Sequence, residues 1–254
     1  MKIDLTAMNF SGNPESDILA RLSKCADIER LRISGWFIKG EIAVALGKLE
    51  RLTALELIDV YWDLTNYMTG LGELSRLKHL ELSSDCLADL SVLKPLTKLE
   101  TLKFTLAHMP FSDQLISRID DVSPLKHLPA LRSLHIYINS NSMSGFAELM
   151  QLRRLHLIIL GGEYDLATLG GLSQLEELIL RQDVQSKPIQ NLEPLAGLIN
   201  LVKLDIRNNG LKSLEGIENM TRLQELDCSE NSIHTLMPLE KLTELKKLSA
   251  SISS

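Results

Sequence analysis

Two stretches near the end of the sequence decide the fold: LVKLDIRNNGL at residues 201–211 and LQELDCSENSI at residues 223–233. The second repeats the first after 22 residues, with apolar residues at places one, four, six and eleven and an asparagine at place nine. A fixed period of roughly 20 to 50 residues is typical of repeat arrays, whose units bury their apolar side chains only by stacking on one another. The apolar places four and six, separated by one residue, predict a short β-strand in each unit.

The order of residues in these stretches is that of a leucine-rich repeat, L-x-x-L-x-L-x-x-N-x-L. Together with the linking segments LEPLAGL at 192–198 and LMPLEKL at 236–242, it resembles the repeats of internalins and of phosphatase-regulator-type proteins. The resemblance implies an α/β solenoid, a leucine-rich-repeat arc or horseshoe with a parallel sheet on its concave side and short helical or 3-10 segments on its convex side. It also implies that the concave face binds proteins.

The same alternation can be followed back to the first residues, and it predicts eleven strands. We find no linker or low-complexity segment, so residues 1–254 are predicted to form a single leucine-rich-repeat domain. The edge strands of such a sheet are open; we expect a monomer, with self-association through these edges as the alternative. The inward-facing pairs of the eleven strands are Ile3/Leu5, Leu31/Ile33, Leu55/Leu57, Leu80/Leu82, Leu102/Phe104, Leu134/Ile136, Leu155/Leu157, Leu178/Leu180, Leu204/Ile206, Leu226/Cys228 and Leu248/Ala250.

The asparagine at the ninth place is predicted to turn into the core and to hydrogen-bond the backbone of the turn. A buried amide is tolerated there because both its donors and its acceptor are used. Asn139, Asn209 and Asn231 occupy this place, and Asp85 and Asp183 can imitate it in part.

Composition excludes several classes of partner. The net charge is −6, from 27 Lys plus Arg against 33 Asp plus Glu, whereas a phosphate backbone needs a basic stripe. The three cysteines, Cys25, Cys86 and Cys228, lack Cys-x-x-Cys spacing and predict neither a disulfide framework nor a zinc site. No apolar run approaches ~20 residues, so we expect no membrane span. The first residues, MKIDL, lack the apolar stretch of a signal peptide, so we expect no cleaved signal peptide and a cytoplasmic location.

The concave face is predicted to be neutral overall. Side chains alternate across a strand, so the third, fifth and seventh places of each unit face outward. With the eighth place included, nine basic and nine acidic residues lie in these columns. Such a face suits one folded protein partner, for which charge sets specificity more than affinity.

The middle of this face is the predicted contact centre, because exposed aromatic and aliphatic residues flanked by charge are typical of one. The alternative is that some of these side chains pack under the long loop after Phe104. The residues in question are Thr105 and Leu106 on the fifth strand, His135, Tyr137 and Ile138 on the sixth, and His156, Ile158 and Ile159 on the seventh, with Arg181 and Arg207 beside them.

A second set of candidate contacts falls on the turns that follow the strands: Trp36, Phe37, Tyr61 and Phe111. Tryptophan and tyrosine are favoured anchors because they bury a large area at small entropic cost. Packing in the core is the alternative for these residues.

No catalytic residue, metal site or cofactor is predicted. His135 and His156 share a column on adjacent strands, but no third ligand lies in register with them. The sequence also lacks G-x-S-x-G, P-loop and H-E-x-x-H motifs. We therefore predict a non-enzymatic protein-binding module, with a bacterial inhibitor or toxin-immunity protein as the favoured use. The alternatives are a bacterial effector or phosphatase-type regulator, and an enzyme with its site near the two histidines.

Overall fold

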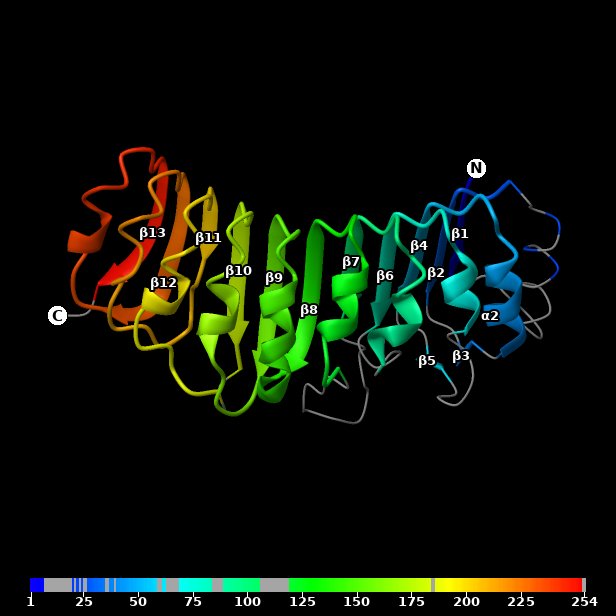
Figure 1. The fold of residues 1–254 in the computed structure, drawn as a ribbon, viewed down its shortest axis with the longest axis horizontal. Coiled ribbons are helices and arrows are strands. Elements are labelled where there is room, and N and C mark those ends of the chain that lie inside the picture. Colours follow the sequence, from blue (N-terminus) through cyan, green and yellow to red (C-terminus); the bar gives the residue numbers. More distant parts are fainter. Residues whose placement is uncertain are drawn as a thin grey trace. The chain divides into compact units, whose positions relative to one another are not determined.

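The fold is a sheet of eleven parallel strands that follow one another in chain order, in a computed structural model (Figure 1). The structure describes residues 1–6, 20, 22, 24, 27–34, 37–38, 40–58, 61–62, 69–83, 89–105, 119–183 and 186–252. The strands are β1 (Lys2–Thr6), β2 (Arg30–Ser34), β4 (Ala54–Ile58), β6 (His79–Ser83), β7 (Thr101–Thr105), β8 (Ser133–Asn139), β9 (Arg154–Leu160), β10 (Glu177–Gln182), β11 (Lys203–Asp205), β12 (Glu225–Ile233) and β13 (Lys247–Ile252).

These are the eleven strands that the sequence predicts, and their register confirms the repeat. Four neighbouring strands, for example, place the same repeat position in register: Leu178, Leu204, Leu226 and Leu248. From β2 to β12, the predicted inward-facing residues are at most 2% exposed. Each coil therefore buries its leucines against the coils before and after it. The leucine-rich-repeat solenoid predicted from the sequence is confirmed.

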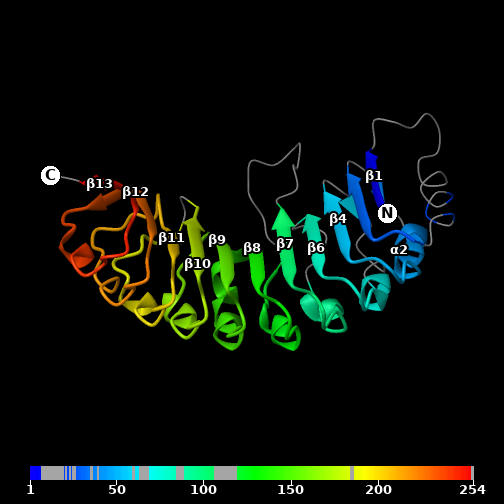
Figure 2. The same ribbon diagram turned by 90° about the horizontal axis from the view of Figure 1, so that it is seen from above.

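Short helical segments cover one face of the sheet, as predicted (Figure 2). Most are 3-10 turns, because the return path of each coil is short and three residues per turn bring i and i+3 onto one side. In the turn Leu90–Leu93 both leucines are buried, and the Asp89 carboxylate caps it by accepting from the N–H of Ser91. The segments are α2 (Gly40–Gly47), η2 (Thr69–Glu73), η3 (Leu90–Leu93), η4 (Ser123–His127), η5 (Ser140–Glu148), η6 (Leu166–Leu169), η7 (Glu193–Leu195) and η8 (Met237–Leu239).

The chain divides into two compact units. The first comprises residues 1–119 and 124–131 and contains β1 to β7; the second comprises 120–123 and 132–254 and contains β8 to β13. The single domain that the sequence predicts over 1–254 stays a prediction.

None of the helices in the described ranges has the length and apolar character needed to cross a membrane. We call the sheet face opposite the helical segments the open face.

Asn209 and Asn231 both turn into the core as predicted, but only Asn231 uses its acceptor as well, because Oδ1 of Asn209 has no hydrogen-bond partner among the described residues. The Asn231 side-chain amide donates to the carbonyl oxygens of Ile206 and Cys228, and its Oδ1 accepts from the N–H groups of Asn209 and Leu211. Asn209 is 0% exposed. Its amide in turn donates to the carbonyl oxygen of Leu180 on β10. These amides link the turns of neighbouring coils.

Asp183 imitates this asparagine, as predicted, because its carboxylate accepts from the Gly161 N–H and the Ser186 hydroxyl. The prediction for Asn139 is wrong. Strand β8 runs on through this residue, which pairs with Leu160 of β9 instead of entering a turn. Its partly exposed amide donates to the Asp120 carboxylate. Asp85 lies outside the described residues.

Cys228 fills an apolar place in the core, as its alignment with Ile206 predicts. The side chain is 0% exposed, and burial raises the pKa of its thiol to about 11. The thiol is therefore protonated and inert at neutral pH.

Candidate functional site

A patch of aromatic and aliphatic side chains occupies the open face of the second unit where β8, β9 and β10 lie side by side. In one column His135 stands opposite His156, which stands opposite Ile179; in the next column Tyr137 stands opposite Ile158. All five side chains are half-buried. We call these five residues, His135, Tyr137, His156, Ile158 and Ile179, the central patch.

Ring stacking orders the aromatic half of the central patch. The His135 and His156 rings stack with centroids 3.8 Å apart and planes inclined by 25°. Tyr137 stacks on His135 at a centroid distance of 5.4 Å. Rings already held against one another lose little conformational freedom when a partner covers them. Among the described residues, the central patch included, no three His, Cys, Asp or Glu side chains converge as metal ligands would.

The structure changes the membership of the predicted contact centre. Ile138 and Ile159 are 0% exposed, so the prediction that they belong to this surface is wrong. Both strands extend beyond the sixth place, and strict alternation then turns the eighth side chain inward. The predicted contact centre does not include Ile179, although its place on the eighth predicted strand indicates an outward-facing side chain. It extends the central patch onto a third strand.

Thr105, also predicted for the contact centre, lies on β7 in the first unit. Its side chain is half-buried, and its hydroxyl donates to the carbonyl oxygen of Leu82 at 3.4 Å. Leu106 lies outside the described residues. A role for Thr105 in partner binding stays a prediction.

Beside the central patch, two arginines converge on one carboxylate. Asp205 is 6% exposed and accepts hydrogen bonds from Arg181, which is half-buried, and from Nη2 of Arg207 at 2.9 Å. Burial would by itself raise the pKa of Asp205, but the hydrogen bonds from Arg181 and Arg207 outweigh it and lower the pKa to about 2. Arg207 also lies 3.7 Å from a carboxylate oxygen of Asp227. We call Arg181, Asp205, Arg207 and Asp227 the charged cluster.

In a neighbouring column of side chains on the open face, the charge alternates between positive and negative from one strand to the next. This column consists of five residues in register on β9 to β13: Arg154, Glu177, Lys203, Glu225 and Lys247. The Lys203 ammonium lies 2.8 Å from Glu177, and this hydrogen bond raises the pKa of Lys203. Because basic and acidic groups neutralise one another along this column, it has no strong field of one sign.

The first unit shows the same pairing of charges on its part of the open face. Arg32 lies 3.7 Å from Glu56, and Lys103 lies 2.8 Å from Glu81. The neutral face predicted by counting charges is thus a face on which opposite charges meet across neighbouring strands. In the second unit, the central patch is where these charges give way to aromatic and aliphatic groups.

The predicted contacts on the turns are only partly within the described residues. Strands β3 (Phe37–Ile38) and β5 (Tyr61–Trp62) form a separate parallel pair, in which Phe37 stands opposite Tyr61. This places Phe37 and Tyr61 at equivalent positions of successive coils. Trp36 and Phe111 lie outside the described residues. Binding through these aromatic residues stays a prediction.

We predict that Asp205 makes the stability of the protein depend on pH in the acid range. Its folded-state pKa of about 2 lies below the ordinary 3.8, so its contribution is complete above pH 4 and is lost as the pH falls toward 2. Wild type should exceed Asp205→Asn in free energy of unfolding by about 2 kcal/mol at pH 6. Urea denaturation at pH 6, 4, 3 and 2 measures the difference, which should largely disappear at pH 2. A difference that stays constant over this range would contradict the assignment.

Comparison with known proteins agrees with this architecture. The family model described as Leucine Rich repeats (2 copies) matches residues 199–240. Among curated proteins, no sequence matches the chain. The chain is thus a leucine-rich repeat protein in fold, and this fold is generally non-catalytic.

Three solved structures illustrate the structural similarity. Internalin C2 of Listeria monocytogenes is 23% identical, with a TM-score of 0.56 over 92% of this chain and 84% of that chain. An internalin, InlF, of the same species is 21% identical, with a TM-score of 0.61 over 94% and 75%. A leucine-rich repeat protein of Leptospira interrogans is 16% identical, with a TM-score of 0.62 over 99% and 67%.

Proposed function

We propose that this chain is a non-enzymatic protein-binding module that recognises one protein partner through the central patch. The observation that carries the proposal is the stacked group of His135, Tyr137 and His156 on an otherwise charge-paired face. Leucine-rich repeat domains typically bind proteins, which supports the same function.

The chemistry of the patch fits the centre of a protein interface. Binding energy at interfaces concentrates in a few aromatic or aliphatic residues near the middle, surrounded by groups that contribute little but exclude water. Tyr137 and Ile158 stand opposite each other in the half-buried patch and meet this description. The surrounding charges already have partners within the sheet, so they set the specificity of docking more than its strength.

For the biological use of this binding, we propose a bacterial inhibitor or toxin-immunity protein that acts in the cytoplasm. The similarity in fold to bacterial leucine-rich repeat proteins supports a bacterial setting, and the free, buried Cys228 suits a reducing compartment. An effector or phosphatase-type regulator is the alternative use of the same surface. Identification of the protein captured by the purified chain distinguishes these uses.

We predict that Tyr137→Ala and Ile158→Ala each weaken partner binding by about 1–3 kcal/mol, because each removes an anchor from the centre of the interface. The partner is first captured from the cytosol and identified, and its dissociation constant is then measured by calorimetry with each variant. Lys247→Ala, on the exposed end of the same face, is the matched control and should leave the dissociation constant unchanged. Unchanged affinity in both patch variants would place the interface elsewhere.

A further inference from the structure

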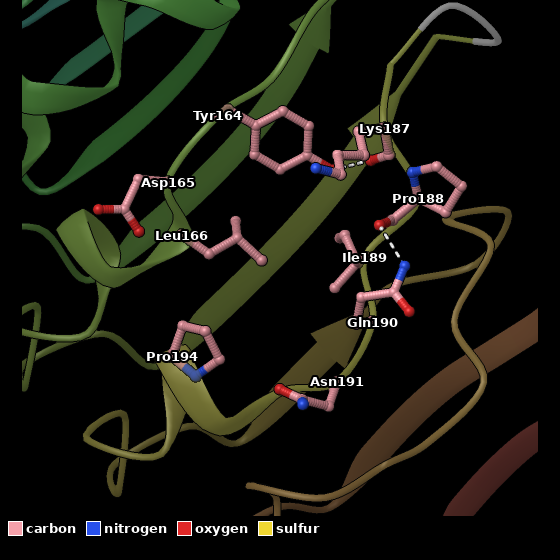
Figure 3. Close-up of a pocket in the computed structure, with 9 residues that line it drawn as sticks. All are labelled: Tyr164, Asp165, Leu166, Lys187, Pro188, Ile189, Gln190, Asn191 and Pro194. Atoms are coloured by element: carbon pink, nitrogen blue, oxygen red, sulfur yellow. Dashed lines mark hydrogen bonds between the residues drawn. The ribbon is translucent and has the colours of Figure 1, made fainter.

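A hollow of about 250 Å³ lies in the second unit, away from the open face, where two successive coils separate (Figure 3). Tyr164 and Leu166 of one coil form one wall, and Ile189 and Asn191 of the next form the other, with Pro194 at one end. The side chains of Leu166 and Ile189 point toward each other across it. We call this hollow the side pocket.

The side pocket arises from a difference in coil length. The step from Leu178 to Leu204 is 26 residues, whereas the next step, to Leu226, is 22. Next to the side pocket, the last backbone hydrogen bond from the longer coil to the preceding one is that of the Lys187 N–H, which donates to the carbonyl oxygen of Gly162; such bonds resume at the Val202 N–H, which donates to that of Glu176.

Beyond Lys187 the longer coil turns to the coil that follows it. The Ile189 N–H donates to the Asn209 carbonyl oxygen, and the Leu192 N–H donates to that of Glu215. The backbone is thus pulled away from residues 164–166, and the side pocket opens between the two coils.

The walls of the side pocket are fixed before any ligand arrives. The Tyr164 hydroxyl lies within hydrogen-bond distance of the Gln182 carboxamide and, at 3.2 Å, of the Lys187 carbonyl oxygen. Burial raises the pKa of Tyr164 to about 12, so the hydroxyl stays a neutral donor. Leu166 and Ile189 are 6% and 5% exposed, respectively. A site with fixed walls binds without first having to order its own side chains.

The charges around the side pocket are already engaged. The Lys187 ammonium pairs with Glu163 at 3.1 Å. Asp165 caps η6 by accepting from the Ala167 N–H, and its carboxylate points away from the hollow (Figure 3). The pocket is therefore matched to an uncharged group, since a charged one would be desolvated without an opposite charge to meet it.

Two residues that line the side pocket have backbone N–H groups that are free to bond a peptide. In the described part of the chain, the backbone N–H groups of Gln190 and Asn191 donate to no protein atom. The volume of the side pocket is below the roughly 300–1,000 Å³ of drug-sized ligand sites. It suits one apolar side chain of a peptide, while the backbone of that peptide stays at the edge of the pocket.

We propose that the side pocket binds one uncharged, apolar side chain carried on an extended segment of a partner protein. Tyr164, Leu166 and Ile189 enclose the side chain, and the backbone N–H groups of Gln190 and Asn191 meet the flanking peptide bonds. This second site does not depend on recognition through the central patch, because it shares no residue with it.

The test uses blocked amino acids as probes of the full, ¹⁵N-labelled chain in solution. N-acetyl-leucine methylamide and N-acetyl-phenylalanine methylamide are titrated to about 20 mM, with N-acetyl-aspartate methylamide as the charged comparison. The two apolar probes should produce saturable amide shifts at Tyr164, Leu166, Ile189 and Asn191. A dissociation constant on the order of 1 mM is expected for ligands of this size. The aspartate probe should produce none.

Matched variants at Tyr164 separate the wall from the hydroxyl. Tyr164→Ala should weaken binding of the apolar probes at least about tenfold, whereas Tyr164→Phe, which keeps the ring, should change it less than about threefold. The wild-type titration is decisive even where Tyr164→Ala fails to fold. Absence of saturable shifts with both apolar probes, shifts confined to β8 and β9, or equal binding of the aspartate probe would each overturn the proposal.

Discussion

Leu204→Ala is expected to lower the free energy of unfolding by about 2–5 kcal/mol. Leu204 is 0% exposed and stands in register between Leu178 and Leu226, so truncation opens a cavity between coils on both sides. Neighbouring coils cannot close this space without breaking the register of the sheet, which keeps the loss toward the upper part of the range. Urea denaturation followed by circular dichroism measures it.

Leu248→Ala is the matched control, because Leu248 holds the same repeat place on β13. It is 42% exposed, against 0% for Leu204, so much of the surface removed already contacts water. The loss should stay below about 1.5 kcal/mol. Equal losses at the two positions would mean that burial between stacked coils is not the main source of stability.

The sequence predicts the strands well because stacking imposes the same condition on every coil. A residue at place four or six must fit against its equivalents on the neighbouring coils, so the pattern persists where other places vary. The inward pairs Leu102/Phe104 and Leu226/Cys228 illustrate this tolerance: an aromatic ring and a thiol both occupy place six, and both are 0% exposed. The buried residues of the core can therefore be predicted from the local alternation of apolar and other residues alone.

The irregular places were harder to predict, because they depend on the path of the backbone between coils. Nothing in the sequence around Ile138 and Ile159 shows that β8 and β9 run on to Asn139 and Leu160. That extension buries the two isoleucines and removes Asn139 from the turn. The side pocket has the same kind of cause, since it follows from where residues 188–191 lie and not from a motif.

Backbone geometry also overrides local preference in the turns. Asn208 and Glu230, 22 residues apart, both adopt left-handed conformations, with φ of 55° and 56°. Asparagine accepts this region readily, whereas glutamate seldom occupies it. The repeated turn therefore persists in the second coil despite an unfavourable residue. The buried asparagine that follows one residue later accounts for that persistence, because it bonds the turn from within.

Asn231→Ala is accordingly expected to lower the free energy of unfolding by about 3 kcal/mol. The substitution leaves the N–H groups of Asn209 and Leu211 and the carbonyl oxygen of Ile206 without their hydrogen-bond partner. Each buried polar group left unsatisfied costs about 1–3 kcal/mol, and partial access of water to the turn offsets part of the sum. Urea denaturation measures the loss.

Asn139→Ala is the informative control for this prediction. Asn139 aligns with Asn231 in the repeat, but its amide is partly exposed and donates to the Asp120 carboxylate at 3.1 Å. Water can replace that bond, so the loss should stay below about 1 kcal/mol. A large loss at Asn139 with a small one at Asn231 would contradict the role of the asparagine as a link between turns. The same residue type at the same repeat place thus stabilises the fold only where the backbone turns around it.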